Sequence, residues 1–133
     1  MAAHYQNYVG LYNPLGLCRF IIKGLAGPDM VADLVNAALG WGWTAKDVFL
    51  TGERLHNLKR LINVRLGISR ADDTLPERFL KEPRPAGGAA GILPNLRLML
   101  DEYYEYRGWD PQTGIPTAER LAALGLGELV RAS

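Results

Sequence analysis

Apolar residues in this sequence recur at intervals of three and four, and no segment alternates apolar and polar residues with a period of two. The first spacing places apolar side chains along one face of a helix, whereas a half-buried strand needs the second. The helical spacing is clear over residues 30–39, 45–66 and 95–106. The sequence therefore predicts an all-α fold, arranged as one compact multi-helix domain over residues 1–133.

Two of these helices are expected to bury the apolar face that their spacing defines. In residues 30–39 this face holds Met30, Val31, Leu34, Val35, Ala38 and Leu39, and in residues 45–66 it holds Val48, Leu55, Leu58, Ile62 and Leu66. Thr44 and Asp47 predict a capped start for the longer helix, because their side chains can bind its first free N–H groups. Gly67 predicts its end.

The N-terminal segment is predicted to form two helices separated by Asn13-Pro14. Residues 2–12 are compatible with a helix, and the residue before a proline is pushed out of the helical region. A second, short helix is expected to begin at Pro14 with Asn13 as its N-cap and to end near Gly24. This arrangement places Cys18 about one turn into that helix.

A long loop rich in proline and glycine is expected over residues 68–94. It contains Pro76, Pro83, Pro85, Gly87, Gly88, Gly91 and Pro94, which leave room only for a turn of helix near residues 76–80. A loop of this length is uncommon in a small domain and often packs against another domain or a cofactor. After the helix at residues 95–106, Pro116-Thr117 is expected to open a last short helix that continues to Leu124.

The charge balance and the apolar segments exclude several classes of partner. The 133-residue chain carries 15 basic and 14 acidic side chains, for a formal charge of +1, so no net field favours nucleic acid. No apolar stretch approaches the roughly 18 residues that a membrane span needs. The first residues resemble no secretory signal. We therefore expect a cytoplasmic protein that binds neither nucleic acid nor membranes.

The single cysteine, Cys18, cannot form a disulfide within the chain. In a reducing compartment it is a buried small hydrophobe, a reactive thiol or a metal ligand. From the residues alone the buried cysteine is favoured. An iron–sulfur cluster needs about four thiolates, so Cys18 can contribute to one only where another segment or chain completes the set.

The remaining polar and aromatic residues do not define a site by themselves. His4 and His56 are far apart in the sequence and are expected to be surface or capping residues rather than zinc ligands. The carboxylates lie among arginines and lysines and are expected to form ion pairs, and the aromatic residues near the last long helix are expected to pack in the core. These groups are Glu53, Asp72, Asp73, Asp101, Glu102 and Glu105, and Tyr103, Tyr104, Tyr106 and Trp109.

Four stretches, taken in order, resemble the C-terminal part of the aldehyde ferredoxin oxidoreductase family. They are Asn13-Pro14-Leu15-Gly16-Leu17-Cys18-Arg19-Phe20; Gly52-Glu53-Arg54 with Asn63-Val64-Arg65-Leu66-Gly67; Asp72-Asp73-Thr74-Leu75-Pro76-Glu77-Arg78; and Tyr103-Tyr104-Glu105-Tyr106-Arg107-Gly108-Trp109-Asp110 with Gly114-Ile115-Pro116-Thr117. The resemblance covers nearly the whole chain. It implies an all-α domain like the C-terminal domain of that family.

The first of these stretches carries the functional residues that the resemblance implies. The family motif has an aspartate that holds a pterin and a cysteine that is the last of four ligands to a [4Fe-4S] cluster. Cys18 matches the cysteine, and the other three cysteines belong to an earlier domain. Asn13 stands where the family has the aspartate, so it brings no charge, although its side-chain carbonyl can still accept a pterin N–H. Leu17 matches the motif leucine, whose backbone is expected to face the pterin.

The resemblance also implies cofactors and partners. Family enzymes oxidise an aldehyde to a carboxylic acid at a tungsten or molybdenum bis-pterin and send the electrons through the cluster to ferredoxin. The implied partners of this chain are the preceding domains of the same enzyme, ferredoxin and a second copy of the chain in a homo-oligomer. We expect an apolar patch of Leu15, Leu17, Phe20 and residues 84–94 to face the missing domains. The alternative is a cofactor-free helical interaction module derived from the family, which Asn13 favours and Cys18 opposes.

Overall fold

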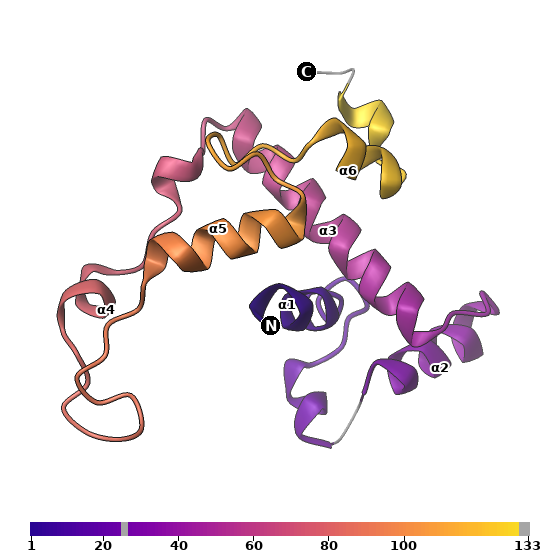
Figure 1. Ribbon diagram of the computed structural model, residues 1–133. Coiled ribbons are helices and arrows are strands. Elements are labelled where there is room, and N and C mark those ends of the chain that lie inside the picture. Colours follow the sequence, from indigo (N-terminus) through magenta and orange to yellow (C-terminus); the bar gives the residue numbers. More distant parts are fainter. Residues whose placement is uncertain (25–26, 131–133) are drawn as a thin grey trace.

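The computed structural model describes residues 1–24 and 27–130, and this part of the chain is built from helices and turns (Figure 1). Its α-helices are α1 (Ala2–Val9), α2 (Pro28–Leu39), α3 (Ala45–Arg65), α4 (Glu77–Lys81), α5 (Leu96–Arg107) and α6 (Ala118–Ala123). Three 3-10 helices accompany them, η1 (Arg19–Gly24), η2 (Arg70–Asp72) and η3 (Gly127–Val130). The all-α prediction is confirmed.

Helix α3 is the longest described element, and α1, α2, α5 and α6 lie beside it, whereas α4 lies away from it (Figure 1). Helix α1 packs across its middle and also meets α5, and α2 packs near its N-terminal end. The crossing of α1 and α3 depends on Gly52, because a Cβ atom there would lie 1.7 Å from the backbone oxygen of Asn7. No helix in the described ranges is long and apolar enough to cross a bilayer.

The junction between α2 and α3 confirms the predicted cap. The N–H of Thr44 donates to the Asp47 carboxylate at 2.8 Å, and the Thr44 hydroxyl donates to the same oxygen at 2.7 Å. These bonds, the one from the hydroxyl first, hold the pKa of Asp47 below its usual value. Asn36 closes the turn, since its amide donates to the Trp43 carbonyl at 2.8 Å and its side-chain oxygen accepts the Trp43 N–H.

An apolar core joins the end of α1 to α2 and α3. Its buried members are Leu11, Tyr12, Val31, Ala32 and Val48. Within α2, however, the predicted inward residues Met30, Leu34, Ala38 and Leu39 are exposed, and only Val31 and Val35 of the predicted set are buried. The spacing therefore predicted the helix correctly and its buried face only in part.

Helix α3 buries a polar face where the sequence predicted an apolar one. Leu58, Ile62 and Leu66 are exposed by 37%, 49% and 75%, whereas Asn57 and Arg60 are buried. The reason is that both polar side chains meet partners from the turn after α5, as described below, so their burial leaves no hydrogen-bonding group unpaired. The predicted inward face of residues 45–66 was wrong beyond Leu55.

Residues 76–94 project from the body of the domain as an arm that contains α4 (Figure 1). We call residues 76–94 the arm. Its tip is closed by hydrogen bonds from the Gly91 N–H to the Arg84 carbonyl and from the Ala90 N–H to the Gly87 carbonyl, each at 3.0 Å. The predicted long loop with one turn of helix is confirmed.

Candidate functional site

Residues 13–20, which we call the cysteine segment, begin with a tight turn rather than a helix. The Gly16 N–H donates to the Asn13 carbonyl at 3.1 Å, and the Leu17 N–H donates to the Tyr12 carbonyl at 2.8 Å. This pair of bonds is a Schellman motif, with Gly16 in the left-handed conformation at φ 68°. The turn ends the helical path that starts with α1.

The predicted helix from Pro14 to Gly24 is therefore wrong. Gly16 at positive φ cannot continue a right-handed helix, and η1 begins only at Arg19. Cys18 lies between the turn and η1, outside any helix. Asn13 is not an N-cap; its backbone carbonyl instead accepts the bond that closes the turn. The helix over residues 2–12 likewise ends at Val9, with Gly10 as its C-cap.

The cysteine segment is anchored by leucines and presents its polar residues to solvent. Leu15 and Leu17 pack against the apolar core and are half-buried, whereas Asn13, Cys18 and Phe20 are exposed. The buried cysteine that the residue types alone favour is thus wrong, because Cys18 is an exposed free thiol. Asn13 lies in the turn and Cys18 follows it, and both are accessible from outside the chain.

The apolar core that supports the cysteine segment contains a buried tyrosine. Tyr12 is buried in the apolar core, and burial, followed by the nearby Tyr8 hydroxyl, raises the pKa of Tyr12 above its usual range. Tyr12 therefore stays uncharged at neutral pH. Leu15, Leu17 and Ile21, which flank Cys18 in the sequence, pack against this apolar core.

Cys18 fits a metal centre only as one ligand of a shared set. A four-iron cluster is held by about four thiolates. In residues 1–24 and 27–130, no three histidine, cysteine or acidic side chains come together in a way that could hold a metal ion. Because Cys18 is exposed, its sulfur is accessible to a metal centre whose other ligands come from another part of the protein. The residues present therefore fit one corner of a cluster and no complete site.

A buried arginine at the end of α5 holds α1, which leads directly into the cysteine segment. Arg107 has no exposed surface. Its Nη2 donates to the Ala3 carbonyl at 3.2 Å and to Gln6 Oε1 at 2.9 Å, and its Nη1 donates to Asn7 Oδ1. Its Nε donates to the Tyr103 hydroxyl at 3.1 Å. The bonds to Ala3, Gln6 and Asn7 hold α1 against α5, and α1 is the helix that precedes the cysteine segment in the sequence.

A second buried arginine ties α3 to the turn after α5. Arg60 Nε donates to the Gly114 carbonyl at 2.8 Å, and its Nη2 lies 2.7 Å from Asp73 Oδ2. The same carboxylate accepts a bond from the Tyr104 hydroxyl. Burial, followed by this bond, raises the pKa of Tyr104 to about 12. Gly114 is required here, because a Cβ would lie 2.1 Å from Arg60 Nη2.

Other residues of the family-like stretches also have contacts within the chain. The Trp109 indole N–H donates to Asn57 Oδ1 at 2.8 Å. Glu53 pairs with Arg120, and Arg54 Nε donates to the Leu124 carbonyl at 2.8 Å. We call Arg60, Arg107 and the residues joined to them the arginine network. Its other members are Ala3, Gln6, Asn7, Asp73, Tyr103, Tyr104 and Gly114, together with Trp109, which lies under the Arg60 guanidinium, and its partner Asn57.

The carboxylates, histidines and aromatic residues follow the sequence expectations in part. Ion pairs hold Glu53, Asp73 and Asp101, whereas Asp72 binds the Ser69 N–H at 2.8 Å as a cap, and Glu102 and Glu105 form no ion pair with the described residues. The His4 ring stacks on Phe49 with centroids 4.2 Å apart. The His56 Nε2 lies 2.9 Å from the Gln6 carbonyl, and burial lowers the pKa of this histidine. Tyr104 and Trp109 are buried as predicted, but Tyr106 is exposed.

The sequence did not reveal the arginine network. Asn7, Asn57, Arg60 and Arg107 were not singled out, because a polar residue on a helix is usually expected to face solvent. Arg107 lies inside a stretch that resembles the family, and Arg60 lies between two such stretches. Their position in or near these stretches was the available signal, and it did not indicate which residues the two arginines contact.

The structure is a helical domain that carries one exposed cysteine. The chain matches the family model described as aldehyde ferredoxin oxidoreductase, domains 2 and 3, over residues 1–126. It is 46% identical over 125 residues to a tungsten-containing aldehyde ferredoxin oxidoreductase of Pyrococcus furiosus, covering 93% of this chain and 20% of the relative. It is 42% identical over 127 residues to that of Thermococcus kodakarensis, covering 95% and 21%.

These matches show that the chain belongs to the aldehyde ferredoxin oxidoreductase family. The recognition made from the four stretches is confirmed. The chain spans about a fifth of the length of the relatives it matches. It is thus similar to one part of a larger oxidoreductase.

Proposed function

We propose that this chain is the C-terminal part of a tungsten- or molybdenum-pterin aldehyde ferredoxin oxidoreductase and that Cys18 provides one thiolate ligand of its [4Fe-4S] cluster. In such an enzyme the bound cofactors supply the redox chemistry, by which an aldehyde and water give a carboxylic acid, two protons and two electrons for ferredoxin. The residues of this chain form one wall of that site. The remaining ligands come from the preceding domains.

The observation that carries this proposal is the difference between the four family-like stretches. Each of the three later stretches contributes a side chain to a contact within the chain, since Glu53 pairs with Arg120, Asp73 with Arg60, and Trp109 with Asn57, and this gives part of their likeness to the family a structural reason. In the first stretch Asn13 and Cys18 are exposed. Their likeness to the family is best explained by contacts outside the chain.

The tight turn limits what each residue of the cysteine segment can offer a pterin. The Leu17 N–H already donates to the Tyr12 carbonyl, so the backbone of Leu17 offers only its carbonyl oxygen as an acceptor. Asn13 has an exposed side chain with one acceptor and two donors and no charge. We propose a neutral pterin contact at Asn13 in place of the charged one in the family.

The apolar residues beside Cys18 have a separate role in the proposal. Leu17 and Ile21 are half-buried against the core, and Phe20 is exposed. In the complete enzyme these side chains would exclude water from the thiolate. Solvent exposure and hydrogen bonding at the sulfur atoms are among the features that set the potential of a cluster.

The test of the proposal is Cys18→Ser in the complete protein. We expect a folded protein that keeps its pterin and metal, has a depleted or altered cluster signal, and reduces ferredoxin much more slowly with aldehyde. Electron paramagnetic resonance of the reduced protein and iron content measure the cluster. Because Cys18 is exposed here, the same change in the 133-residue chain should alter its free energy of unfolding by no more than about 0.5 kcal/mol.

An unaltered cluster spectrum with normal turnover in the Cys18→Ser protein would favour the cofactor-free module. A second measurement uses the chain alone, which should be colourless after anaerobic reconstitution with iron and sulfide, because one thiolate cannot retain a four-iron cluster. Stoichiometric iron with a cluster spectrum would contradict the shared ligand set.

A further inference from the structure

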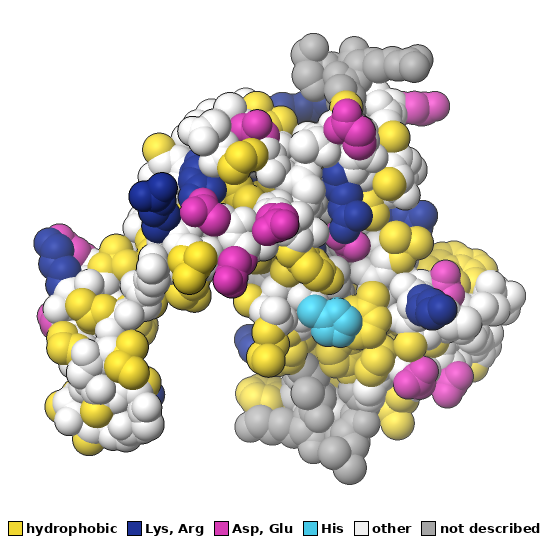
Figure 2. Space-filling model, in the orientation of Figure 1, with side chains coloured by type: hydrophobic (Ala, Val, Ile, Leu, Met, Phe, Trp, Pro, Cys, Tyr) yellow, Lys and Arg dark blue, Asp and Glu magenta, His cyan; other side chains and the backbone are white. Residues whose placement is uncertain are grey.

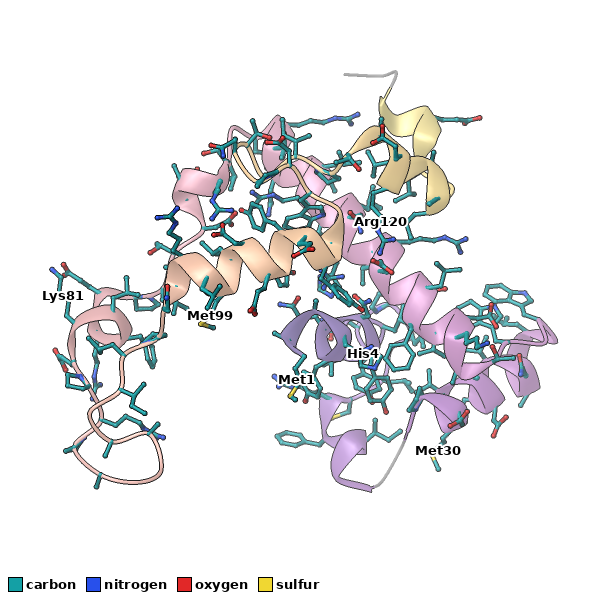
Figure 3. The ribbon with its side chains drawn as sticks, viewed as in Figure 1. Met1, His4, Met30, Lys81, Met99 and Arg120 are labelled. Atoms are coloured by element: carbon teal, nitrogen blue, oxygen red, sulfur yellow. The ribbon has the colours of Figure 1, made fainter. Side chains whose placement is uncertain are left out.

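A cavity of about 530 Å³ opens between α3 and α5, and residues of α1 and of 73–75 complete its wall. Sites for small molecules commonly have volumes of roughly 300–1,000 Å³ and combine apolar side chains with a few polar groups. Met99, in this wall, is 52% exposed and points from α5 into the notch that separates the arm from the body of the domain (Figure 3). Figure 2 shows that this notch is open to solvent. The cavity is therefore accessible from outside the chain.

Helices α3 and α5 line the cavity with side chains of different chemistry. On each helix the wall residues are three or four positions apart, so they form one helical face. The face of α5 is apolar except for a tyrosine hydroxyl, and the face of α3 is polar. The wall residues are Leu96, Met99, Leu100 and Tyr103 of α5, and His56, Lys59, Arg60 and Asn63 of α3. A ligand held between the two helices therefore meets an apolar side and a polar side.

Most of the polar groups in the wall already have partners within the chain. Among the described residues of the wall, Asp73 is the only carboxylate, and Arg60 pairs with it. The Tyr104 hydroxyl donates to the same carboxylate. The Tyr103 hydroxyl donates to Gln6 Oε1 at 2.7 Å. These groups belong to the arginine network and leave no unbalanced charge in the cavity.

Lys59 and Asn63 are two polar wall residues whose side chains remain available. Within residues 1–24 and 27–130, neither side chain takes part in an ion pair or a hydrogen bond. They are four positions apart in α3, so an ammonium and an amide lie on the same face of the helix. His56 is neutral at pH 7, because burial lowers its pKa below the usual 6.5. Lys59 is thus the one unbalanced charge in the described wall.

We infer that this cavity binds a small monocarboxylate with an apolar body. An ionised carboxylate only accepts hydrogen bonds, so its two oxygens match the two donors, the Lys59 ammonium and the Asn63 amide. Its single negative charge balances Lys59, and its apolar body lies against Leu96, Met99 and Leu100. The inference goes beyond the proposed function and does not depend on it, because none of residues 13–20 lines the cavity.

The experiment adds sodium hexanoate to the full 133-residue chain and follows the methionine methyl groups by nuclear magnetic resonance. We expect a saturable shift of the Met99 signal with a dissociation constant of about 0.1–1 mM. Met30 of α2 lies outside the wall, so its signal is the internal reference and should not move. Hexanamide has the same apolar chain without the charge and should bind at least about threefold more weakly.

Two pairs of variants, measured by titration calorimetry, test the two sides of the cavity. Lys59→Gln should weaken hexanoate binding at least about threefold, whereas Lys46→Gln, in α3 but outside the wall, should not change it. Met99→Glu places a negative charge in the wall and should abolish binding. Leu98→Glu is its matched control, because Leu98 is also 52% exposed and lies outside the wall. Circular dichroism checks that each variant is folded, as expected for substitutions at exposed positions.

A Met99 signal that does not saturate by about 10 mM hexanoate would overturn the inference. Equal affinities for hexanoate and hexanamide would overturn the carboxylate assignment, because Lys59 would not distinguish charge. Equal losses in Lys59→Gln and Lys46→Gln would contradict the location, since the anion would then follow the overall charge of α3. Displacement of hexanoate by an equal concentration of inorganic phosphate would contradict the role of the apolar side of the cavity.

Discussion

The arginine network and the cysteine segment differ in which kinds of residue they bury and which they expose. Arg107 is fully buried and donates to side chains and a backbone carbonyl of α1, while Cys18 is exposed and lies outside the helices. The network is polar where a core is usually apolar, and the cysteine segment exposes residues that usually avoid water. The difference teaches that in this chain buried polar residues hold the structure, whereas the exposed soft and apolar residues are the ones to which the proposed function assigns contacts outside the chain.

The contrast between the two regions is tested most strongly by replacing one arginine in each of them. Arg107→Ala should lower the free energy of unfolding by about 3–5 kcal/mol, because it leaves several neutral oxygen acceptors of α1 without their donor, each at a cost of roughly 1–3 kcal/mol where it stays buried. Arg19→Ala, in the exposed cysteine segment, should change it by no more than about 0.5 kcal/mol. Urea unfolding of the two variants, followed by circular dichroism, measures the contrast. Similar losses in both would mean that the cysteine segment also holds the fold.

A smaller effect is expected from adding one methyl group between α1 and α3. Gly52→Ala should cost about 1–3 kcal/mol, because α1 must shift to accommodate the new Cβ beside Asn7. Gly88→Ala in the arm is the control, since nothing lies within 4 Å of a Cβ there. Thermal unfolding of both variants tests the pair. A Gly52→Ala protein as stable as the parent would mean that α1 is not closely held on α3.

The smallest effect is expected at His56, which touches the network through Gln6. Burial, helped by the charges of Arg107 and Lys59, lowers the pKa of His56 below the usual histidine value of 6.5. The folded protein therefore binds this proton less readily than the unfolded chain, and stability is full above pH 6.5 and falls as the pH drops below it. His56→Gln should flatten the unfolding free energy between pH 7 and about 5. If the unfolding free energy of the His56→Gln protein kept the same dependence on pH, that dependence would come from other titratable groups.

Much of the helical framework was predictable from local signals. The helices near residues 30–39, 45–66 and 95–106 follow from apolar spacing and from the Thr44 cap, which act within a few residues. The buried face of α3 was not predictable, since Leu58 and Ile62 have the spacing of core residues whether the same chain or another domain covers them. Burial of Asn57 and Arg60 depends on partners more than 50 residues away.

The candidate residues come from the family resemblance, and their local conformation could not be predicted from the sequence. The family resemblance identified Cys18 and Asn13, but the apolar pattern around Leu15, Leu17 and Ile21 suggested a helix. One glycine decides otherwise, because Gly16 at positive φ closes the turn and turns Cys18 out of the helical path. A spacing pattern contains no information about the sign of φ at a single residue.

The bond between Arg107 and Asn7 joins positions 100 residues apart, which has a consequence for biosynthesis. As the chain leaves the ribosome, α1 appears first and has no Arg107 to bind until most of the sequence has been translated. The cysteine segment, which follows α1, gains its final support only then. If Cys18 is a cluster ligand as proposed, insertion of iron and sulfide should follow translation, and a chain truncated before Arg107 should accept no cluster even where all the cysteines are present.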